Sequence, residues 1–260
     1  MMYRNGGWLS VMGVAAGLGV VAWAHVATGG SLRTFVQAEA LVVVFGGTFA
    51  ALVVSFSSGA LRAAAAAVID LVRRRPEPIE GLVPAFMGYA RKARQRGLMV
   101  IEDDAARAGD AFLARALTLL ASGMSVEVVR EALDLEARVC AEREEERAQV
   151  FEAAAGYAPT LGIVGAVLGL MRVMEHFSAS AVGPGIAAAF VATLYGVGLA
   201  NLLFLPLATR LRARARFDAL RRELVIDGVL ALHDGASPGV VEERLAGYLR
   251  KRGGAFAEAA

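Results

Sequence analysis

Charge is scarce in this sequence and is missing altogether from long segments. Of the 260 residues, 20% are Asp, Glu, Lys or Arg and 57% are hydrophobic, whereas about a quarter of the residues in soluble domains are charged. Four stretches lack all four charged types: 5–32, 40–61, 153–171 and 177–209. Each can cross a hydrocarbon core of roughly 30 Å, whereas an alanine-rich soluble bundle, the alternative, needs helices with a polar face. We predict an all-α membrane protein with four transmembrane helices.

Several residue patterns that carry out chemistry are also missing. The single cysteine, Cys140, excludes an internal disulfide, and no metal-ligand spacing, phosphate-binding loop or nucleophile-base set occurs. We therefore predict neither enzymatic activity nor a bound cofactor. The last two apolar stretches contain no Asp, Glu, Lys, Arg or His at mid-depth. Because ion transfer through lipid ordinarily needs ionisable groups that bind and release the ion, this chain lacks an ion carrier of its own.

Lysine and arginine are distributed unevenly around the apolar stretches. Between the second and third stretches lie 14 Lys/Arg and 16 Asp/Glu, and 10 Lys/Arg follow the fourth, whereas the two short connections offer only Arg33. Because flanking Lys and Arg stay in the cytoplasm, both termini and the long middle segment are predicted to face inwards. A secretory signal peptide is the alternative for the first stretch, but the apolar run exceeds the usual core of about 7–15 residues. The arginines after the fourth stretch suit anionic lipid headgroups better than nucleic acid.

The chain is predicted to have four parts, with breaks in the cytoplasmic region where glycine and proline interrupt the helical pattern. They are a transmembrane hairpin (1–56, helices about 9–26 and 36–56), a cytoplasmic helical domain (57–150), a second transmembrane hairpin (151–209, helices about 153–173 and 184–208) and a basic cytoplasmic tail (210–260). The predicted breaks are at 73–81, Gly97, Gly109 and Gly123, and an outer loop holds Gly183, Pro184 and Gly185. The last cytoplasmic helix, about 125–155, is predicted to run on into the third membrane segment.

Small residues dominate the two C-terminal apolar stretches. They are Gly162, Gly165 and Gly169 on the third, and Ala188, Ala189, Ala192, Gly196 and Ala200 on the fourth. Small side chains let membrane helices approach closely, so these two helices are predicted to pack against helices rather than lipid. Thr193 lies near the middle of the fourth helix, where its hydroxyl can either bond a backbone carbonyl one turn back or line a wet path.

Two prolines lie close to the predicted cytoplasmic boundary of these helices. Pro159 follows the start of the third helix and Pro206 precedes the end of the fourth, and each removes a backbone hydrogen bond. A static kink is one interpretation, since membrane helices tolerate proline when neighbours satisfy the freed carbonyl. The other is a pair of flexure points that transmit a membrane event into the cytoplasmic region.

Three segments of the sequence are distinctive: "LVVVFGGTFAALVVSF" (41–56), "FEAAAGYAPTLGIVGAVLGL" (151–170) and "GPGIAAAFVATLYGVGLANLLFLPLATRL" (183–211). They resemble the MotA/PomA family, the A subunit of the bacterial flagellar stator. The resemblance implies an inner-membrane subunit of an ion-driven torque generator, with five A subunits around two B subunits. The B subunit of the family carries the membrane aspartate that binds the ion and a peptidoglycan-binding domain.

The resemblance also implies roles for particular residues. The two functional prolines of the family fall on Pro159 and Pro206, and its threonine facing the ion path falls on Thr193. The charged pair that engages the rotor protein FliG falls on Arg94 and Glu102, within "RKARQRGLMVIEDD".

The residue at position 166 bears on the ion that is used. Sodium-driven members of the family commonly carry threonine where this chain has Ala166, and losing that hydroxyl removes an oxygen that could replace sodium's hydration shell. We therefore predict proton use. Two alternatives remain on sequence grounds: an energising subunit of a non-flagellar transport or gliding system, and a membrane scaffold without ion flux.

Overall fold

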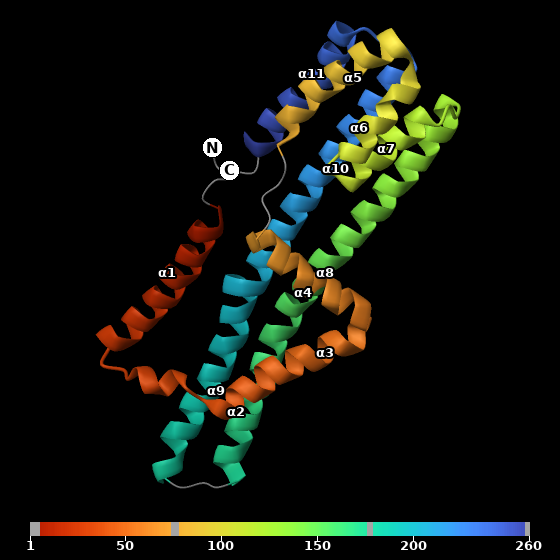
Figure 1. The fold of residues 1–260 in the computed structure, drawn as a ribbon. Helices are drawn as coiled ribbons and strands as arrows, with labels where there is room; N and C mark the ends of the chain where they lie inside the picture. Colours follow the sequence, from red (N-terminus) through yellow and green to blue (C-terminus); the bar gives the residue numbers. More distant parts are fainter. Residues whose placement is uncertain (1–5, 74–77, 176–178, 258–260) are drawn as a thin grey trace. The chain divides into compact units, whose positions relative to one another are not determined.

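Every regular element is a helix in the part of the chain that the computed structural model describes, residues 6–73, 78–175 and 179–257 (Figure 1). This confirms the predicted all-α class. The described chain divides into two compact units. We call residues 1–74 and 145–212 the apolar unit, and residues 75–144 and 213–260 the charged unit.

The apolar unit contains the predicted membrane segments. Its elements are α1 (Gly6–Ala27), the 3-10 helix η2 (Leu32–Phe35), α2 (Ala38–Leu41), the π-helix η3 (Val42–Gly46), α3 (Gly47–Ser55), α4 (Ser58–Arg73), α8 (Val126–Glu175) from Glu145 onwards, α9 (Ala179–Leu199), the π-helix η6 (Ala200–Phe204) and the first residues of α10 (Leu205–His233). Three described spans are long and apolar enough to cross a membrane, and they are Leu32–Ser55, Val126–Glu175 and Val182–His233. The first predicted span is represented by a shorter apolar helix, Met12–Ala27.

The predicted outer loop at Gly183, Pro184 and Gly185 is wrong, because these residues lie within α9, which begins at Ala179. Pro184 lies five residues after the first residue of α9, so it removes a hydrogen bond that would otherwise reach the carbonyl of Ser180 and destabilises the helix locally. Packing nevertheless favours the helix over a loop. A Cβ atom added to Gly185 would collide with the side chain of Val173, so α9 lies directly against the end of α8 here.

Residues 57–73 belong to the apolar unit, although the predicted cytoplasmic domain includes them. Within this range α4 follows α3 almost directly, and it is amphipathic, with Ala60 and Ala64 buried and Arg62 and Asp70 exposed. Alanine at spaced positions lets α4 pack closely while its other face stays polar. The boundary between the units therefore falls at 74, beside the first arginine-proline break.

The charged unit is a helical bundle around one hydrophobic core. Its elements are the 3-10 helix η4 (Ile79–Gly81), α5 (Leu82–Arg96), the 3-10 helix η5 (Leu98–Ile101), α6 (Glu102–Arg107), α7 (Ala111–Ala121), the first part of α8, the later part of α10 and α11 (Pro238–Ala257). Fully buried side chains such as Phe86, Leu117 and Leu230 form the core. The predicted breaks at Gly97 and Gly123 are confirmed, since both have positive φ, of 85° and 72°. The break predicted at Gly109 is also confirmed, because this residue separates α6 from α7.

Asp110 connects local and tertiary structure in this unit. Its carboxylate accepts hydrogen bonds from the backbone N–H groups of Phe112, at 2.7 Å, and Leu113, at 3.3 Å, which caps the start of α7. The same carboxylate forms an ion pair with Arg221 of α10, and both side chains are 14% exposed.

Asp110→Ala is expected to lower the free energy of unfolding by about 2–4 kcal/mol, because it removes a helix cap and leaves a poorly solvated guanidinium without this partner. Asp110→Asn keeps the capping oxygen and loses only the charge, so its effect should be about half as large. Chemical denaturation of the detergent-solubilised protein measures both. Equal losses for the two variants would contradict the capping role.

Candidate functional site

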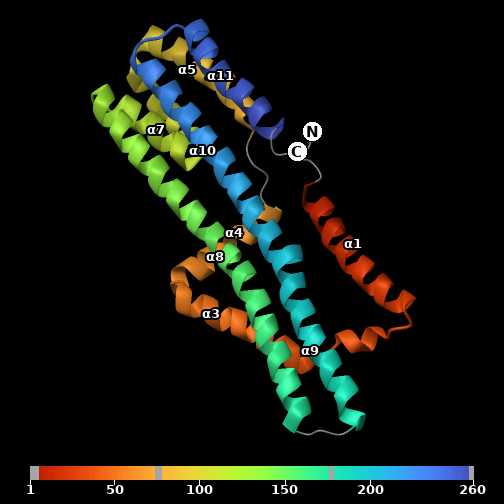
Figure 2. The same ribbon diagram turned by 180° about the vertical axis from the view of Figure 1, so that it is seen from behind.

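The helices α8 and α9 lie side by side in the apolar unit and meet along a seam of small residues (Figure 2). A Cβ atom added to Gly162 would lie 3.0 Å from the carbonyl oxygen of Ala192. One added to Gly165 would lie 2.9 Å from the Cβ of Ala192, and one added to Gly169 would lie 3.3 Å from the backbone nitrogen of Ala189. The two helices therefore pack so closely that a larger residue at any of these positions would force neighbouring atoms to move, and the movement would be smallest at Gly169.

Gly196 is the position where α9 comes closest to the backbone of α8, and it faces the first of the two prolines. A Cβ atom added to Gly196 would overlap the carbonyl oxygen of Ala158 and would lie 3.0 Å from the Cα of Pro159. Pro159 is inside the continuous helix α8 and cannot donate a hydrogen bond to the carbonyl of Ala155. The structure therefore brings together Pro159 and Gly196 from two different helices.

Pro206 is positioned by a feature that the sequence analysis missed. It is the second residue of α10 and is separated by Leu205 alone from the π-helix η6, where the N–H of Leu205 donates to the carbonyl of Ala200. A π turn inserts one extra residue into the hydrogen-bond ladder, and proline, which has no N–H to contribute, is compatible with the disrupted ladder. Pro206 is exposed, whereas Pro159 is half-buried.

Thr193 and Ala166 lie half-buried on the two helices of the seam. The Cα of Thr193 would be 3.3 Å from a Cβ added to Gly162. Within the described residues the hydroxyl of Thr193 has no hydrogen-bond partner, whereas Thr48 donates to the carbonyl of Val44 at 2.6 Å. Thr193 therefore keeps its hydroxyl available, although a neighbouring threonine bonds its own helix one turn back.

A third element packs on the seam. A Cβ atom added to Gly165 would lie 3.5 Å from the side chain of Val43 in the π-helix η3. Gly47 of α3 lies against the side chain of Leu161. At the other end of α3, the hydroxyls of Ser55 and Tyr157 are 2.8 Å apart. The segment from α2 to α3 is therefore attached to α8 along its length.

Two polar contacts join the ends of these apolar helices. The hydroxyl of Tyr195 donates to the carbonyl of Phe35 and accepts from the backbone N–H of Gln37 at 3.4 Å. Arg172 of α8 and Glu39 of α2 form an ion pair. The sequence analysis did not find these partners, because each contact joins residues more than 130 positions apart.

Most of the arginine cluster after the fourth apolar stretch is neutralised by ion pairs. Arg212 contacts Glu145 at 2.8 Å and also Glu152, and the other pairs are Arg214 with Asp218, Arg221 with Asp110 and Arg222 with Glu144. The sequence analysis assigned this cluster to lipid headgroups. The carboxylates that pair with these guanidinium groups come from Asp110, α8 and α10.

Arg94 and Glu102 lie on either side of the break at Gly97. Arg94 is exposed in the last turn of α5, and Glu102 is exposed as the first residue of α6. Neither forms an ion pair within the described residues, whereas Lys92 and Asp104 pair with each other at 2.6 Å. Burial raises the pKa of nearby Tyr89, and the Asp104 carboxylate raises it further, so that hydroxyl remains neutral. The predicted pair is therefore free to meet a charged partner.

The backbone at Gly97 sets the geometry of this pair. With φ 85° and ψ 169°, it occupies a region essentially restricted to glycine. Gly97→Ala is expected to cost about 1–3 kcal/mol or to refold the turn, which moves Glu102 relative to Arg94.

The free energy of unfolding should fall by that amount, because an alanine side chain is strained in this backbone conformation. Gly88→Ala is the matched control, because an added Cβ there meets no atom within 4 Å. Chemical denaturation of the detergent-solubilised protein measures both variants, and wild-type stability in Gly97→Ala would contradict the expectation.

Comparison with known proteins identifies the family of this chain. A model of the MotA/TolQ/ExbB proton channel family matches residues 104–223. Motility protein A of Bacillus subtilis (strain 168) is 31% identical over 242 residues, covering 92% of this chain and 90% of its own length. The chain belongs to the MotA/PomA family. Chemotaxis protein PomA of Vibrio alginolyticus is 30% identical over 243 residues, covering 93% of this chain and 95% of PomA.

A solved structure extends the likeness to the fold of this MotA/PomA member. A chain in the structure of the flagellar MotAB stator complex from Bacillus subtilis superposes with a TM-score of 0.86 at 31% identity, covering 96% of this chain and 98% of that chain. The likeness therefore includes both the seam of the apolar unit and the helices of the charged unit.

Proposed function

We propose that this protein is the A subunit of a flagellar stator and that it converts proton flow across the bacterial inner membrane into torque on the rotor. The full-length likeness to a chain of a MotAB stator complex is the observation that carries the proposal. The close seam between α8 and α9 supports it, because a tightly packed helix pair can pass a small displacement to a distant unit.

The ion carrier belongs to a partner. Residues 153–171 and 177–209 contain no Asp, Glu, Lys or Arg, so a MotB-like B subunit supplies the membrane aspartate as well as the peptidoglycan anchor. Exposed apolar side chains on α8 and α9 suit contacts with that subunit, with other copies of this chain and with lipid, and among them are Ile163, Val167, Leu170, Phe190 and Val197. By family analogy, five A subunits surround two B subunits.

The proposed function requires a membrane topology in which the charged unit can reach the rotor. All four apolar stretches span the membrane, α1 being the first, and both termini and the charged unit lie in the cytoplasm, where lysine and arginine are retained. Arg94 and Glu102 then face the rotor protein FliG on the cytoplasmic side.

Coupling begins where the partner's aspartate is protonated. The change of charge displaces α8 and α9, on which Thr193 and Ala166 lie near the ion path. Flexure at Pro159 and at the π turn before Pro206 passes the displacement inwards, and Arg94 and Glu102 push on the rotor through electrostatic contact. The methyl group of Ala166 offers no oxygen to a sodium ion, which favours the proton.

A complementation experiment tests this function. The protein and its B subunit are expressed as the only stator in a strain with an assembled but paralysed flagellum, and motor speed is measured against external sodium and against pH. Rotation that ignores sodium at fixed pH and slows as the proton gradient collapses is expected. Speed that tracks sodium would overturn proton use, and the absence of both rotation and ion leak would favour a scaffold.

A further inference from the structure

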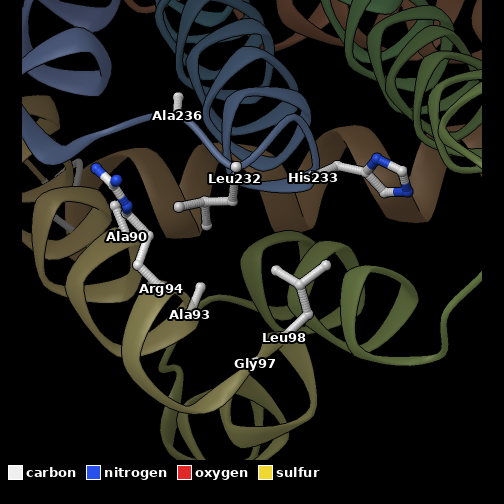
Figure 3. Close-up of a pocket in the computed structure, with 9 residues that line it drawn as sticks. Ala90, Ala93, Arg94, Gly97, Leu98, Leu232, His233 and Ala236 are labelled. Atoms are coloured by element: carbon white, nitrogen blue, oxygen red, sulfur yellow. The ribbon is translucent and has the colours of Figure 1, made fainter.

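A small pocket opens in the charged unit beside the predicted rotor-contact residues. It has a volume of about 220 Å³ and is lined from three segments: the end of α5, the turn at Gly97 and Leu98, and the end of α10 with the turn after it. Figure 3 shows the side chains of Ala93, Leu98 and Leu232 converging on the pocket. The pocket wall is therefore mainly aliphatic.

Two polar groups border this aliphatic wall. The guanidinium of Arg94 extends past Ala90 at one side, away from Leu98 (Figure 3). The imidazole of His233 points away from α5, and its Nε2 lies 3.2 Å from the carbonyl oxygen of Met124. Arg94 is thus the charged group on the rim that is not already paired, which indicates that a negative group lies beside whatever fills the pocket.

The size of the pocket limits its occupant. Sites for small molecules and cofactors usually have volumes of about 300–1,000 Å³, so 220 Å³ is small for such a ligand. It suits one aliphatic side chain of a partner, and interface hot spots are commonly single anchors in such pockets.

An exposed apolar residue directly follows the pocket wall in the sequence. Met99 is 76% exposed, the highest value among the large hydrophobic side chains described in the charged unit. It lies between Arg94 and Glu102 in sequence, and directly follows Leu98 of the pocket wall. Such an exposed methionine is typical of a contact surface that adapts to its partner.

We propose that this pocket receives one aliphatic side chain of the rotor protein, with Arg94 pairing a neighbouring carboxylate of the rotor and Met99 packing beside the inserted side chain. The proposal rests on the proposed stator function and adds an apolar anchor to its charged contact. The partner surface carries a protruding Leu, Ile or Met with a carboxylate beside it for Arg94 and a basic group for the exposed Glu102. The exposed Arg91 and Arg96 on the same end of α5 add to the positive charge that the carboxylate requires.

Filling the pocket from either side tests the proposal in the full stator complex. Ala93→Leu fills it from α5, and Ala236→Leu fills it from the turn between α10 and α11. Both are expected to reduce torque at least tenfold and to reduce photo-crosslinking from a probe at position 99 to the rotor protein by a similar factor. Ion leak through the complex with its B subunit should stay within twofold of the wild type.

Two control variants accompany these measurements. Ala213→Leu adds the same bulk to an exposed alanine of the charged unit, roughly 30 Å along α10 from Leu232, and should change nothing. Met99→Ser should reduce both torque and crosslinking from a probe at position 102. Leu135→Ser, which truncates another exposed side chain, should reduce neither.

The outcomes separate this proposal from the stator function. Normal torque in both pocket-filled variants would overturn the pocket while leaving the stator function intact. Reduced torque with unchanged crosslinking would also overturn it and would favour a small regulatory ligand. A wild-type complex that neither rotates the motor nor leaks ions would instead overturn the stator function itself.

Discussion

Gly196→Ala is expected to abolish torque and ion conduction, although it adds a single methyl group. The new Cβ would overlap the carbonyl oxygen of Ala158 and approach the Cα of Pro159 to 3.0 Å. Both are backbone atoms, which cannot rotate away as a side chain would. Overpacking of this kind costs roughly 1–3 kcal/mol, and relieving it requires α8 and α9 to separate. The seam beside Pro159 is thereby opened.

Gly198→Ala is the matched control, because it lies two residues further along the same helix and an added Cβ there meets no atom within 4 Å. Alanine is the better helix former by about 1 kcal/mol, so this variant should be as stable as the wild type or more stable. Thermal unfolding of the purified complex, ion leak and motor rotation measure the difference. If Gly196→Ala conducts ions and rotates the motor normally, the close seam is not required.

Pro159→Ala is expected to stabilise the protein and to reduce torque at least tenfold. The alanine N–H can donate to the carbonyl of Ala155, which restores a helical hydrogen bond and removes a penalty of about 3 kcal/mol. A straighter and stiffer α8 is more stable, but it no longer bends where it faces Gly196. Opposite changes in stability and torque distinguish a flexure point from a residue needed only for folding.

Pro184→Ala is the comparison, since Pro184 also lies inside a helix, near the start of α9. It should raise the melting temperature and leave torque unchanged. Calorimetry and tethered-cell rotation on the same preparations test both variants. Wild-type torque in a stabilised Pro159→Ala complex would establish that the proline only shapes the resting helix.

Local composition was sufficient to predict much of the fold. The charge-free stretches predicted the apolar segments because a helix in lipid must be apolar over its whole length. The breaks at Gly97 and Gly123 followed from a conformation that other residues rarely adopt, and both glycines have positive φ. The run of α8 from the charged unit into the apolar unit followed from unbroken helical periodicity across Glu145.

The same local reasoning failed where a distant partner decides the structure. The glycines and the proline at 183–185 suggested a loop. The helix α9 instead begins before Pro184, where Gly185 packs against Val173, and a contact between two helices cannot be recognised from the local sequence. The arginines of α10 appeared suited to lipid because their partners, such as Asp110 and Glu144, are 111 and 78 positions away. The two π-helices could not be predicted from the sequence pattern. Both lie within mostly apolar runs, where one extra residue per turn disturbs no visible periodicity.

Arg94 and Glu102 were indicated only by the resemblance to the MotA/PomA family. The sequence by itself determined the helical class, the apolar segments, the lack of an ion carrier in those segments and the two prolines, Pro159 and Pro206, near the ends of the apolar helices. These depend on the chemistry of single residues and their near neighbours. Only the tertiary structure decided that Gly196 faces Pro159, that a π turn precedes Pro206 and that Leu232 meets Ala93 around a pocket beside Arg94. Close packing depends on shape between helices that are distant in the chain, and no local pattern specifies that shape.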